Sequence, residues 1–330
     1  MKQQFLFKTI FWVSLFLSIS LWAKLSLPEF RTLYHHQHEV SRAQFFLSGK
    51  AILSVGYDNA IRYFSLAKKR NIVVHNSKYW IYRFAISPNQ RFIAYTTART
   101  NHIRVFDLKT RKVKRILQGH ISTVRGLAFH PSGKYLVSTS DDQKLIQWDL
   151  QKGREVMRKS IDKDYISHLL FDKKGNLLAA GMNTLYVLQG EKYDIVHRYP
   201  FKMQVLDMAL YPKQNVVLLA GNPMTNLGHN LTIINLDKHS THPHRLPTKI
   251  LTSVAVSPDE LLLATGDIKG NVEFFNYSSL QSFKKEKVHG KYVASVGFSA
   301  NNRDFFSASY DGVVKVWRRD EVLRKNKLDK

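Results

Sequence analysis

The chain has 330 residues, of which 44% are hydrophobic, so it is long and apolar enough to bury a core and is not wholly disordered. It contains no cysteine, which excludes disulfides, thiolate metal sites and a cysteine nucleophile. The formal net charge is +25, from 50 Lys and Arg against 25 Asp and Glu. That charge indicates either an anionic partner or a solvated basic surface, and the scatter of the basic residues along the chain favours the second.

Residues 1–23 have the pattern of a signal peptide. Lys2 and Lys8 precede an uncharged, mostly apolar stretch from Thr9 to Ala23, which is shorter than the ~20 residues that a membrane span needs. We therefore expect these residues to direct the protein to the periplasm or the exterior. Leu21 fits poorly at the third position before a cleavage site, so an uncleaved segment that tethers the protein to a membrane is the alternative.

Beyond this segment, the chain repeats a unit of about 42 residues. Residues 119–150 contain a Gly-His pair, an apolar strand, a Pro-Ser-Gly turn, a strand of small residues, an Asp-Asp turn and a strand that ends in Trp-Asp. Three units share a histidine, an aspartate 22 positions later and an aromatic residue six positions further on: His36, Asp58 and Phe64; His120, Asp142 and Trp148; His289, Asp311 and Trp317.

Residues 119–150 resemble a WD40 repeat over their full length, and residues 289–317 and 36–64 follow the same pattern. Four degenerate units occupy residues 80–108, 165–188, 205–236 and 250–276. The chain is identified as a member of the WD40-repeat family, and the N-terminal segment indicates an exported bacterial member. The resemblance implies an all-β, seven-bladed propeller of four-stranded antiparallel blades over residues 24–317, with a basic tail at 318–330. Residues 29–34 are placed to add the outer strand of the last blade and close the ring.

Histidine, serine and aspartate within one unit also suggest a hydrolase. The sequence has no GxSxG elbow and no Gly-rich oxyanion loop. The resemblance implies instead hydrogen-bonded tetrads that rigidify two blades. Their members are His120, Ser138, Asp142 and Trp148, and His289, Ser307, Asp311 and Trp317. We expect no catalytic activity and no cofactor. Of the histidines at 35–38, His36 already occupies the tetrad position, and the group at 239–244 is expected to lie in a solvated loop. We expect neither group to bind a metal.

The resemblance places up to three residues of each blade on the narrow top face, where WD40 propellers bind partners. Aromatic and arginine side chains, which are enriched at interface hot spots, dominate these positions. The candidate partner-binding residues are Tyr57, Trp80, Tyr82, Arg99, Arg125, Tyr165, Tyr292 and Tyr310. The same alignment adds Glu39 in the first blade and Ile250, Thr252 and Ile268 in the sixth. The chain is rich in aromatics throughout, with 15 Tyr and 20 Phe, so some would reach this face by chance.

These features predict a scaffold that binds a protein or peptide partner as a monomeric ring, in the role of an accessory or assembly factor for an envelope complex. No small-molecule substrate is implied. The alternative is that the +25 charge binds an anionic surface or polymer, such as lipid headgroups, lipopolysaccharide, a glycan or nucleic acid.

Overall fold

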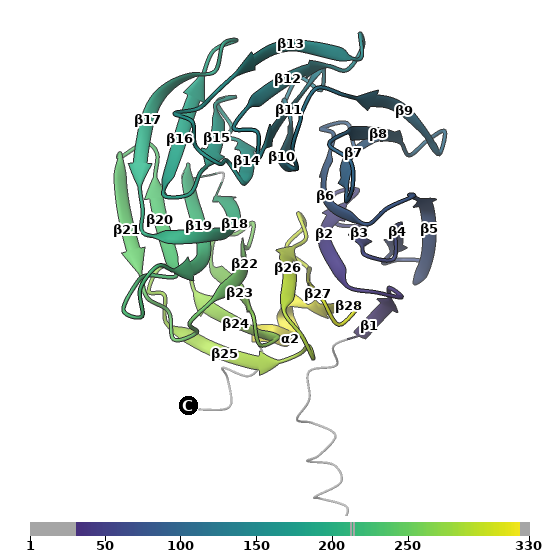
Figure 1. The fold of residues 1–330 in the computed structure, drawn as a ribbon. Coiled ribbons are helices and arrows are strands. Elements are labelled where there is room, and N and C mark those ends of the chain that lie inside the picture. Colours follow the sequence, from purple (N-terminus) through teal and green to yellow (C-terminus); the bar gives the residue numbers. More distant parts are fainter. Residues whose placement is uncertain (1–30, 212, 214, 324–330) are drawn as a thin grey trace, which may run out of the picture.

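A computed structural model describes residues 31–211, 213 and 215–323, and these residues form seven four-stranded antiparallel sheets around a central axis (Figure 1). The predicted seven-bladed propeller is therefore confirmed. Each of the first six sheets uses four consecutive strands, in the order in which they follow along the chain. The candidate signal segment, residues 1–23, lies outside the described residues.

The first three blades cover residues 40–159. Their strands are β2 (Val40–Phe46), β3 (Ala51–Gly56), β4 (Ala60–Ser65) and β5 (Arg70–Asn76); β6 (Ile81–Ile86), β7 (Phe92–Thr97), β8 (Ile103–Asp107) and β9 (Lys112–Leu117); and β10 (Val124–Phe129), β11 (Tyr135–Ser140), β12 (Leu145–Asp149) and β13 (Arg154–Lys159).

Blades four to six continue to residue 287. Their strands are β14 (His168–Phe171), β15 (Leu177–Ala180), β16 (Thr184–Gln189) and β17 (Asp194–Pro200); β18 (Met203–Tyr211), β19 (Val216–Pro223), β20 (Leu231–Asn235) and β21 (Ser240–His244); and β22 (Leu251–Val256), β23 (Leu262–Asp267), β24 (Asn271–Asn276) and β25 (Ser282–Lys287).

The seventh blade joins the two ends of the described chain. It consists of β26 (Val293–Phe298), β27 (Asp304–Ser309) and β28 (Val313–Arg318), with β1 (Arg31–His35) hydrogen-bonded to β28 as its outer strand. The backbone N–H of His36 continues this pairing and donates to the Gly312 carbonyl at 2.8 Å. The closing strand expected from residues 29–34 is therefore observed. It leaves no open edge between the first and last blades.

Hydrophobic side chains fill the spaces between neighbouring sheets. The second strand of each blade is almost wholly buried, because both of its faces pack against adjacent blades, whereas the outer strands are largely exposed. Hydroxyl groups add bonds between blades by donating to carbonyls on, or just before, the innermost strand of the next blade. These pairs are Ser41 to Ile81 at 2.6 Å, Thr139 to Ile166 at 3.0 Å and Thr252 to Val293 at 2.7 Å.

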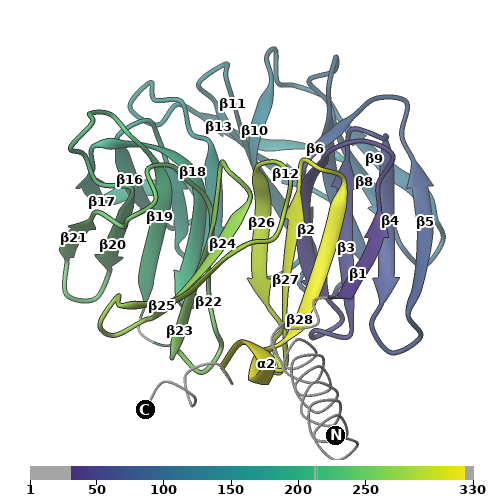
Figure 2. The same cartoon turned by 90° about the horizontal axis from the view of Figure 1, so that it is seen from below.

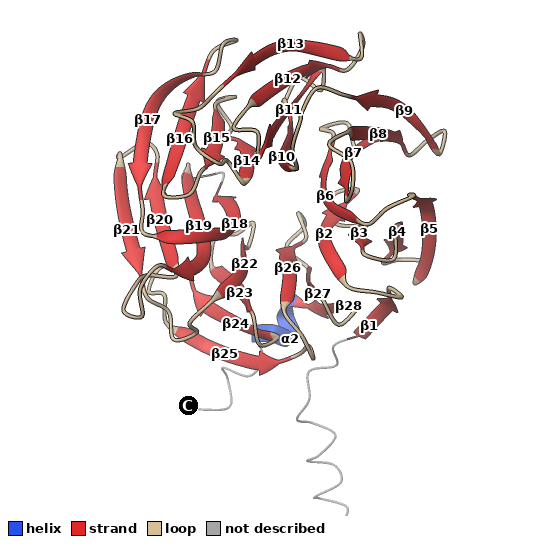
Figure 3. Ribbon diagram, in the orientation of Figure 1, coloured by secondary structure: helices blue, strands red, loops and turns tan. Residues whose placement is uncertain are grey.

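The fold extends beyond residue 317, where the sequence suggested a separate basic tail. Strand β28 ends at Arg318, and a short helix α2 (Arg319–Leu323) follows on the face away from the turns between second and third strands (Figures 2 and 3). Val322 of this helix is buried against the core between blades six and seven. No helix within the described ranges is long and apolar enough to cross a bilayer.

The packing between blades seven and one predicts where loss of a buried side chain destabilises the propeller most. Phe306 is 2% exposed and packs with Val40 and Phe64 of the first blade. Phe306→Ala should lower the free energy of unfolding by about 3–5 kcal/mol, because it removes a buried ring and leaves a cavity. Urea unfolding followed by circular dichroism measures this.

Ile121→Ala is the control for this prediction, because the Ile121 side chain is 83% exposed and should change stability by less than ~0.5 kcal/mol. Equal stabilities of the Phe306→Ala and Ile121→Ala variants would contradict a structural role for the core between blades one and seven.

Candidate functional site

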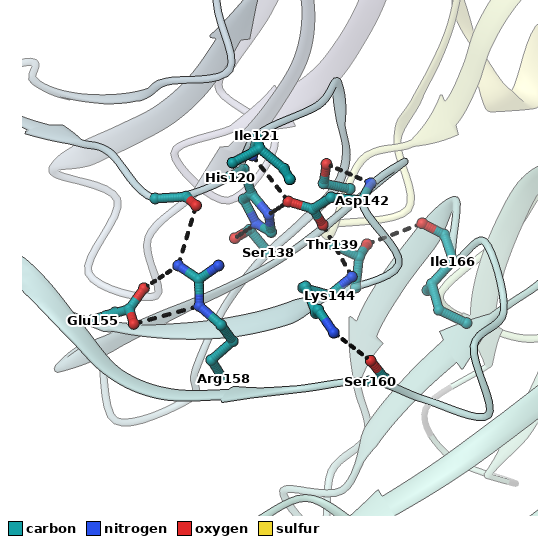
Figure 4. A network of polar contacts seen from close by, with 12 residues as sticks. His120, Ile121, Ser138, Thr139, Asp142, Lys144, Glu155, Arg158, Ser160 and Ile166 are labelled. Carbon is teal, nitrogen blue, oxygen red and sulfur yellow. Dashed lines mark hydrogen bonds and ion pairs between the residues drawn. The ribbon is translucent and has the colours of Figure 1, made fainter.

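The tetrad of blade three is fully connected, and Figure 4 shows three of its members, His120, Ser138 and Asp142. The indole N–H of Trp148 donates to Ser138 Oγ at 2.8 Å, the two ring nitrogens of His120 lie 2.8 Å from Ser138 Oγ and 2.8 Å from Asp142, and Trp148 is 1% exposed. Burial, opposed by the Asp142 carboxylate, lowers the pKa of His120, so the ring is neutral and has a single N–H. With that proton on Nδ1, Ser138 accepts from Trp148 and donates to His120, which donates to Asp142.

Blades seven and one have related networks. His289 lies 2.6 Å from Ser307 Oγ and 3.0 Å from Asp311, and these distances match those in blade three. In blade one, where Phe64 replaces tryptophan, Asp58 pairs with both His36 at 2.9 Å and Arg62 at 3.0 Å. These side-chain hydrogen bonds join residues of the same blade. Such an arrangement stabilises the ring and exposes no nucleophile.

Blade six has an aspartate in its turn that the repeat alignment missed. Lys269 occupies the position expected for the tetrad aspartate, but Asp267 at the end of β23 accepts the hydrogen bonds of this turn. Its carboxylate accepts from the backbone N–H groups of Lys269 and Asn271 at 2.8 and 2.9 Å and from the Asn271 amide at 2.6 Å.

A cavity of about 1050 Å³ lies where the turns between second and third strands converge with the segments that enter the innermost strands. We call it the top-face cavity. Those turns lie at the same end of every antiparallel blade, so residues from separate repeats converge there. All eight candidate partner-binding residues line it: Tyr57, Trp80, Tyr82, Arg99, Arg125, Tyr165, Tyr292 and Tyr310.

Aromatic rings from three adjacent blades form a continuous cluster on one side of this cavity. Tyr57 stacks on Trp80 with centroids 5.1 Å apart, its hydroxyl lies 3.2 Å from that of Tyr310, and Tyr310 meets Tyr292 edge-on at 4.5 Å. Burial raises the pKa of both Tyr310 and Tyr292, so both phenols stay protonated. The cluster is held in place by its own contacts, and the outer ring, Trp80, remains 50% exposed.

Sequence reasoning missed two apolar residues at the rim. Met182 and Met224 lie in the turns between the second and third strands of blades four and five, line the cavity and are exposed. Together with Trp80 and Tyr165 they form a set of exposed apolar side chains, which we call the apolar rim, beside the charged Arg125 and Asp141. The degenerate units did not align well enough to find them, although each follows the second strand of its blade in the same way as Tyr57 and Tyr310.

Sequence reasoning also missed a ring of residues on the seven innermost strands. Each of these residues pairs with the second strand of its own blade, at the position directly after the one that holds serine in the tetrads. They are Arg42, Arg83, Gly126, His168, Asp207, Ser253 and Ser295. We call this set the channel ring. The sequence spacing could have found them. Arg42, Gly126 and Ser295 each come six positions after the histidine of their repeat, one position beyond the last residue assigned to the top face in that segment.

Not every expected top-face position faces the cavity. Glu39, Ile250, Thr252 and Ile268 do not line it. Thr252 is fully buried, because its hydroxyl donates to the Val293 carbonyl of the next blade. Blade six therefore contributes little to this face, and the cavity is formed mainly by the other six blades.

The networks and the sheet architecture define the class of WD40-repeat β-propellers. A family model described as WD domain, G-beta repeat matches residues 111–149 and 279–318, which contain the two complete sets of tetrad residues. The chain therefore has WD40 repeats at these two places.

Relatives with WD repeats have varied descriptions. The Target of rapamycin complex subunit wat1 of Schizosaccharomyces pombe is 25% identical over 284 residues, which cover 82% of this chain and 75% of that protein. Nuclear distribution protein nudF of Aspergillus niger is 42% identical over 72 residues, covering 22% of this chain and 16% of that protein. Transcription factor unc-37 of Caenorhabditis elegans is 27% identical over 161 residues, covering 48% and 26% respectively. All three organisms are eukaryotes.

The tetrads predict an acid-dependent loss of stability. Burial opposes ionisation of Asp311, but the hydrogen bond from His289 and those from backbone N–H groups lower the pKa of Asp311 to about 2. An unfolded aspartate has a pKa of about 3.9, so this stabilisation is present above that pH and is lost as the pH falls towards 2. Asp311→Asn should therefore destabilise the protein most near neutral pH.

The stability gap between wild type and Asp311→Asn should shrink by about 1 kcal/mol between pH 6 and pH 3, measured by urea unfolding at each pH. A gap that is the same at both pH values would show that the Asp311 carboxylate has no lowered pKa in the folded protein.

Proposed function

We propose that this protein is a non-catalytic scaffold whose top-face cavity binds an extended segment of a protein partner. The observation that carries the proposal is the convergence of the stacked aromatic cluster and the exposed apolar rim on one large cavity. Exposed clusters of Trp, Tyr and Met are typical of protein-binding surfaces and cost solubility where they have no partner.

The similarity to a subunit of a complex supports the same kind of role. The relative wat1 is named as a complex subunit, and the alignment covers most of both chains. A rigid ring that presents a pre-formed cavity loses little conformational freedom when it binds, which favours affinity.

Anionic surfaces or polymers are the second candidate, because of the +25 charge. The salt dependence of binding distinguishes an anionic surface or polymer from a protein partner. Binding through many phosphate or headgroup contacts falls steeply with ionic strength, whereas binding through aromatic anchors does not.

The test is affinity capture from extract of the native host with the full chain, at low and at high salt. Combining Trp80→Ala with Tyr292→Ala should weaken capture of the partner by about 30-fold or more at both salts, because each ring is an expected hot spot. Ile116→Ala, which removes a similarly exposed side chain from the outer strand of blade two, is the matched control and should capture normally.

Unchanged capture by the Trp80 and Tyr292 double variant would overturn the proposal. Recovery of lipid, glycan or nucleic acid alone, lost at high salt, would support the second candidate.

We also propose that residues 1–23 direct export and that the protein is an accessory or assembly factor of an envelope complex. The charged start and the apolar stretch from Thr9 to Ala23 support export. The mature protein should then begin near residue 24, which N-terminal sequencing of the protein from its host would establish. An intact Met1 would leave only the membrane-tethered form of this proposal.

A further inference from the structure

The charges of the channel ring do not balance. Arg42 of blade one spans to Asp207 of blade five, with the guanidinium 2.7 Å from the carboxylate, and the other oxygen of Asp207 accepts from the Val254 N–H at 3.0 Å. Burial works against it, but the Asp207 carboxylate raises the pKa of Arg42. This pair is therefore neutral overall and joins opposite sides of the ring.

His168 supplies no compensating charge. It is 7% exposed, and burial, reinforced by the charges of Arg83 and Arg42, lowers its pKa well below the usual range. Its Nδ1 lies 2.9 Å from the Ser167 hydroxyl. The His168 imidazole is therefore uncharged near pH 7.

Arg83 is the unbalanced member. Its guanidinium donates to the backbone carbonyl of Arg125 at 3.2 Å and to that of Tyr82 at 3.5 Å, and it forms no ion pair with any residue that the structure describes. Burial, followed by the Arg42 charge, lowers the pKa of Arg83 to about 10, so it remains a cation at neutral pH. A partly buried cation without a counter-ion is costly, and an anion that entered the cavity would remove that cost.

The neighbouring acid is already engaged. Arg125 and Asp141 form three hydrogen bonds of 2.7–3.0 Å at the edge of the same cavity. Asp141 therefore neutralises Arg125 and is not available to Arg83. Arg83 and Arg42 line the same cavity as Tyr292. Burial raises the pKa of the Tyr292 phenol and the charges of these two arginines act to lower it, so the positive charge lies near the aromatic cluster.

We propose that Arg83 binds one anionic side chain of the partner segment, a carboxylate or a phosphate ester, while the apolar rim holds the residues on either side. This inference rests on the proposed function. The fork of guanidinium N–H groups matches both anions. Arg83 lies on the innermost strand β6 and lines the cavity, whereas Trp80, Tyr165 and Met182 are exposed around it. A projecting side chain of a protein segment therefore suits this site better than a flat membrane, which would meet the exposed side chains first.

The first experiment identifies sequences that the cavity accepts. A display library of random twelve-residue peptides is selected on the full chain, on Arg83→Gln and on the Trp80→Ala, Tyr292→Ala variant. We expect peptides from the wild type to share an Asp or Glu flanked by apolar residues, and peptides from Arg83→Gln to lack that acid. If the wild type enriches the same peptides as the Trp80 and Tyr292 variant, the proposed function fails and this inference with it.

The second experiment measures the coupling between the two charges. For the best peptide, Arg83→Gln and a Glu→Gln change in the peptide should each weaken binding by about tenfold or more, and the combination should cost little beyond either alone. Arg83→Lys should retain part of the affinity because it keeps the charge. Arg154→Gln, which removes the same charge from the exposed outer strand of blade three, should bind as wild type does.

Phosphoserine in place of the acidic residue distinguishes the two sources of anion. Tighter binding of the phosphopeptide assigns the site to a phosphate ester, and tighter binding of the acidic peptide assigns it to a carboxylate; either result supports the proposal. Peptides that lose binding with Trp80→Ala and Tyr292→Ala but bind Arg83→Gln as well as wild type would overturn this inference and leave the proposed function intact. Urea unfolding of each variant separates lost binding from lost folding.

Discussion

The pairing of β1 with β28 is the constraint on which the other features of the ring depend. A radial array of sheets has two unpaired edges until its ends meet, and here residues separated by almost the whole described chain pair in register, from Arg31 with Val316 to His35 with Val313. The backbone bonds alone are few. Their strength comes from the core beneath them, where Phe306 and Val314 pack against the first blade. Once closed, each blade has a neighbour on both sides, and each second strand can be buried on both faces.

The polar networks are the second source of rigidity, and they operate within blades. In blade three a neutral histidine links Ser138 to Asp142, and Trp148 on the neighbouring strand β12 adds the last hydrogen bond. Each group is satisfied, so burial of these polar atoms costs little. Blades that lack the full set use other residues, such as Asp267 in the turn of blade six. The ring therefore tolerates degenerate repeats as long as every turn has an acceptor for its N–H groups.

This rigid frame explains why a recognition surface can lie at the centre of the ring. Side chains such as Trp80 and Met182 are exposed in a structure that does not collapse around them, because the blades behind them are fully packed. The same rigidity keeps the cation of Arg83 inside the cavity, although no carboxylate of the described residues pairs with it. In a softer fold the side chain would move to solvent, where its hydration would be regained.

The sequence by itself determined the period of the repeat, the number of blades, the closing strand and the residue types of the tetrads, because each follows from the spacing and number of the repeat units along the chain. It also placed Trp80, Tyr292 and the other candidate residues at the correct end of their blades, since a residue's position along a strand is a local property. Only the tertiary structure decided which side chains meet across the ring. Arg42 pairs with Asp207, 165 positions away, whereas Arg83 bonds to backbone carbonyls and has no ion-pair partner among the described residues. Thr252 turns inward towards Val293 although its sequence position indicated the surface. These outcomes depend on how closely neighbouring blades approach and on the curvature that closure imposes, which are properties of all seven repeats together.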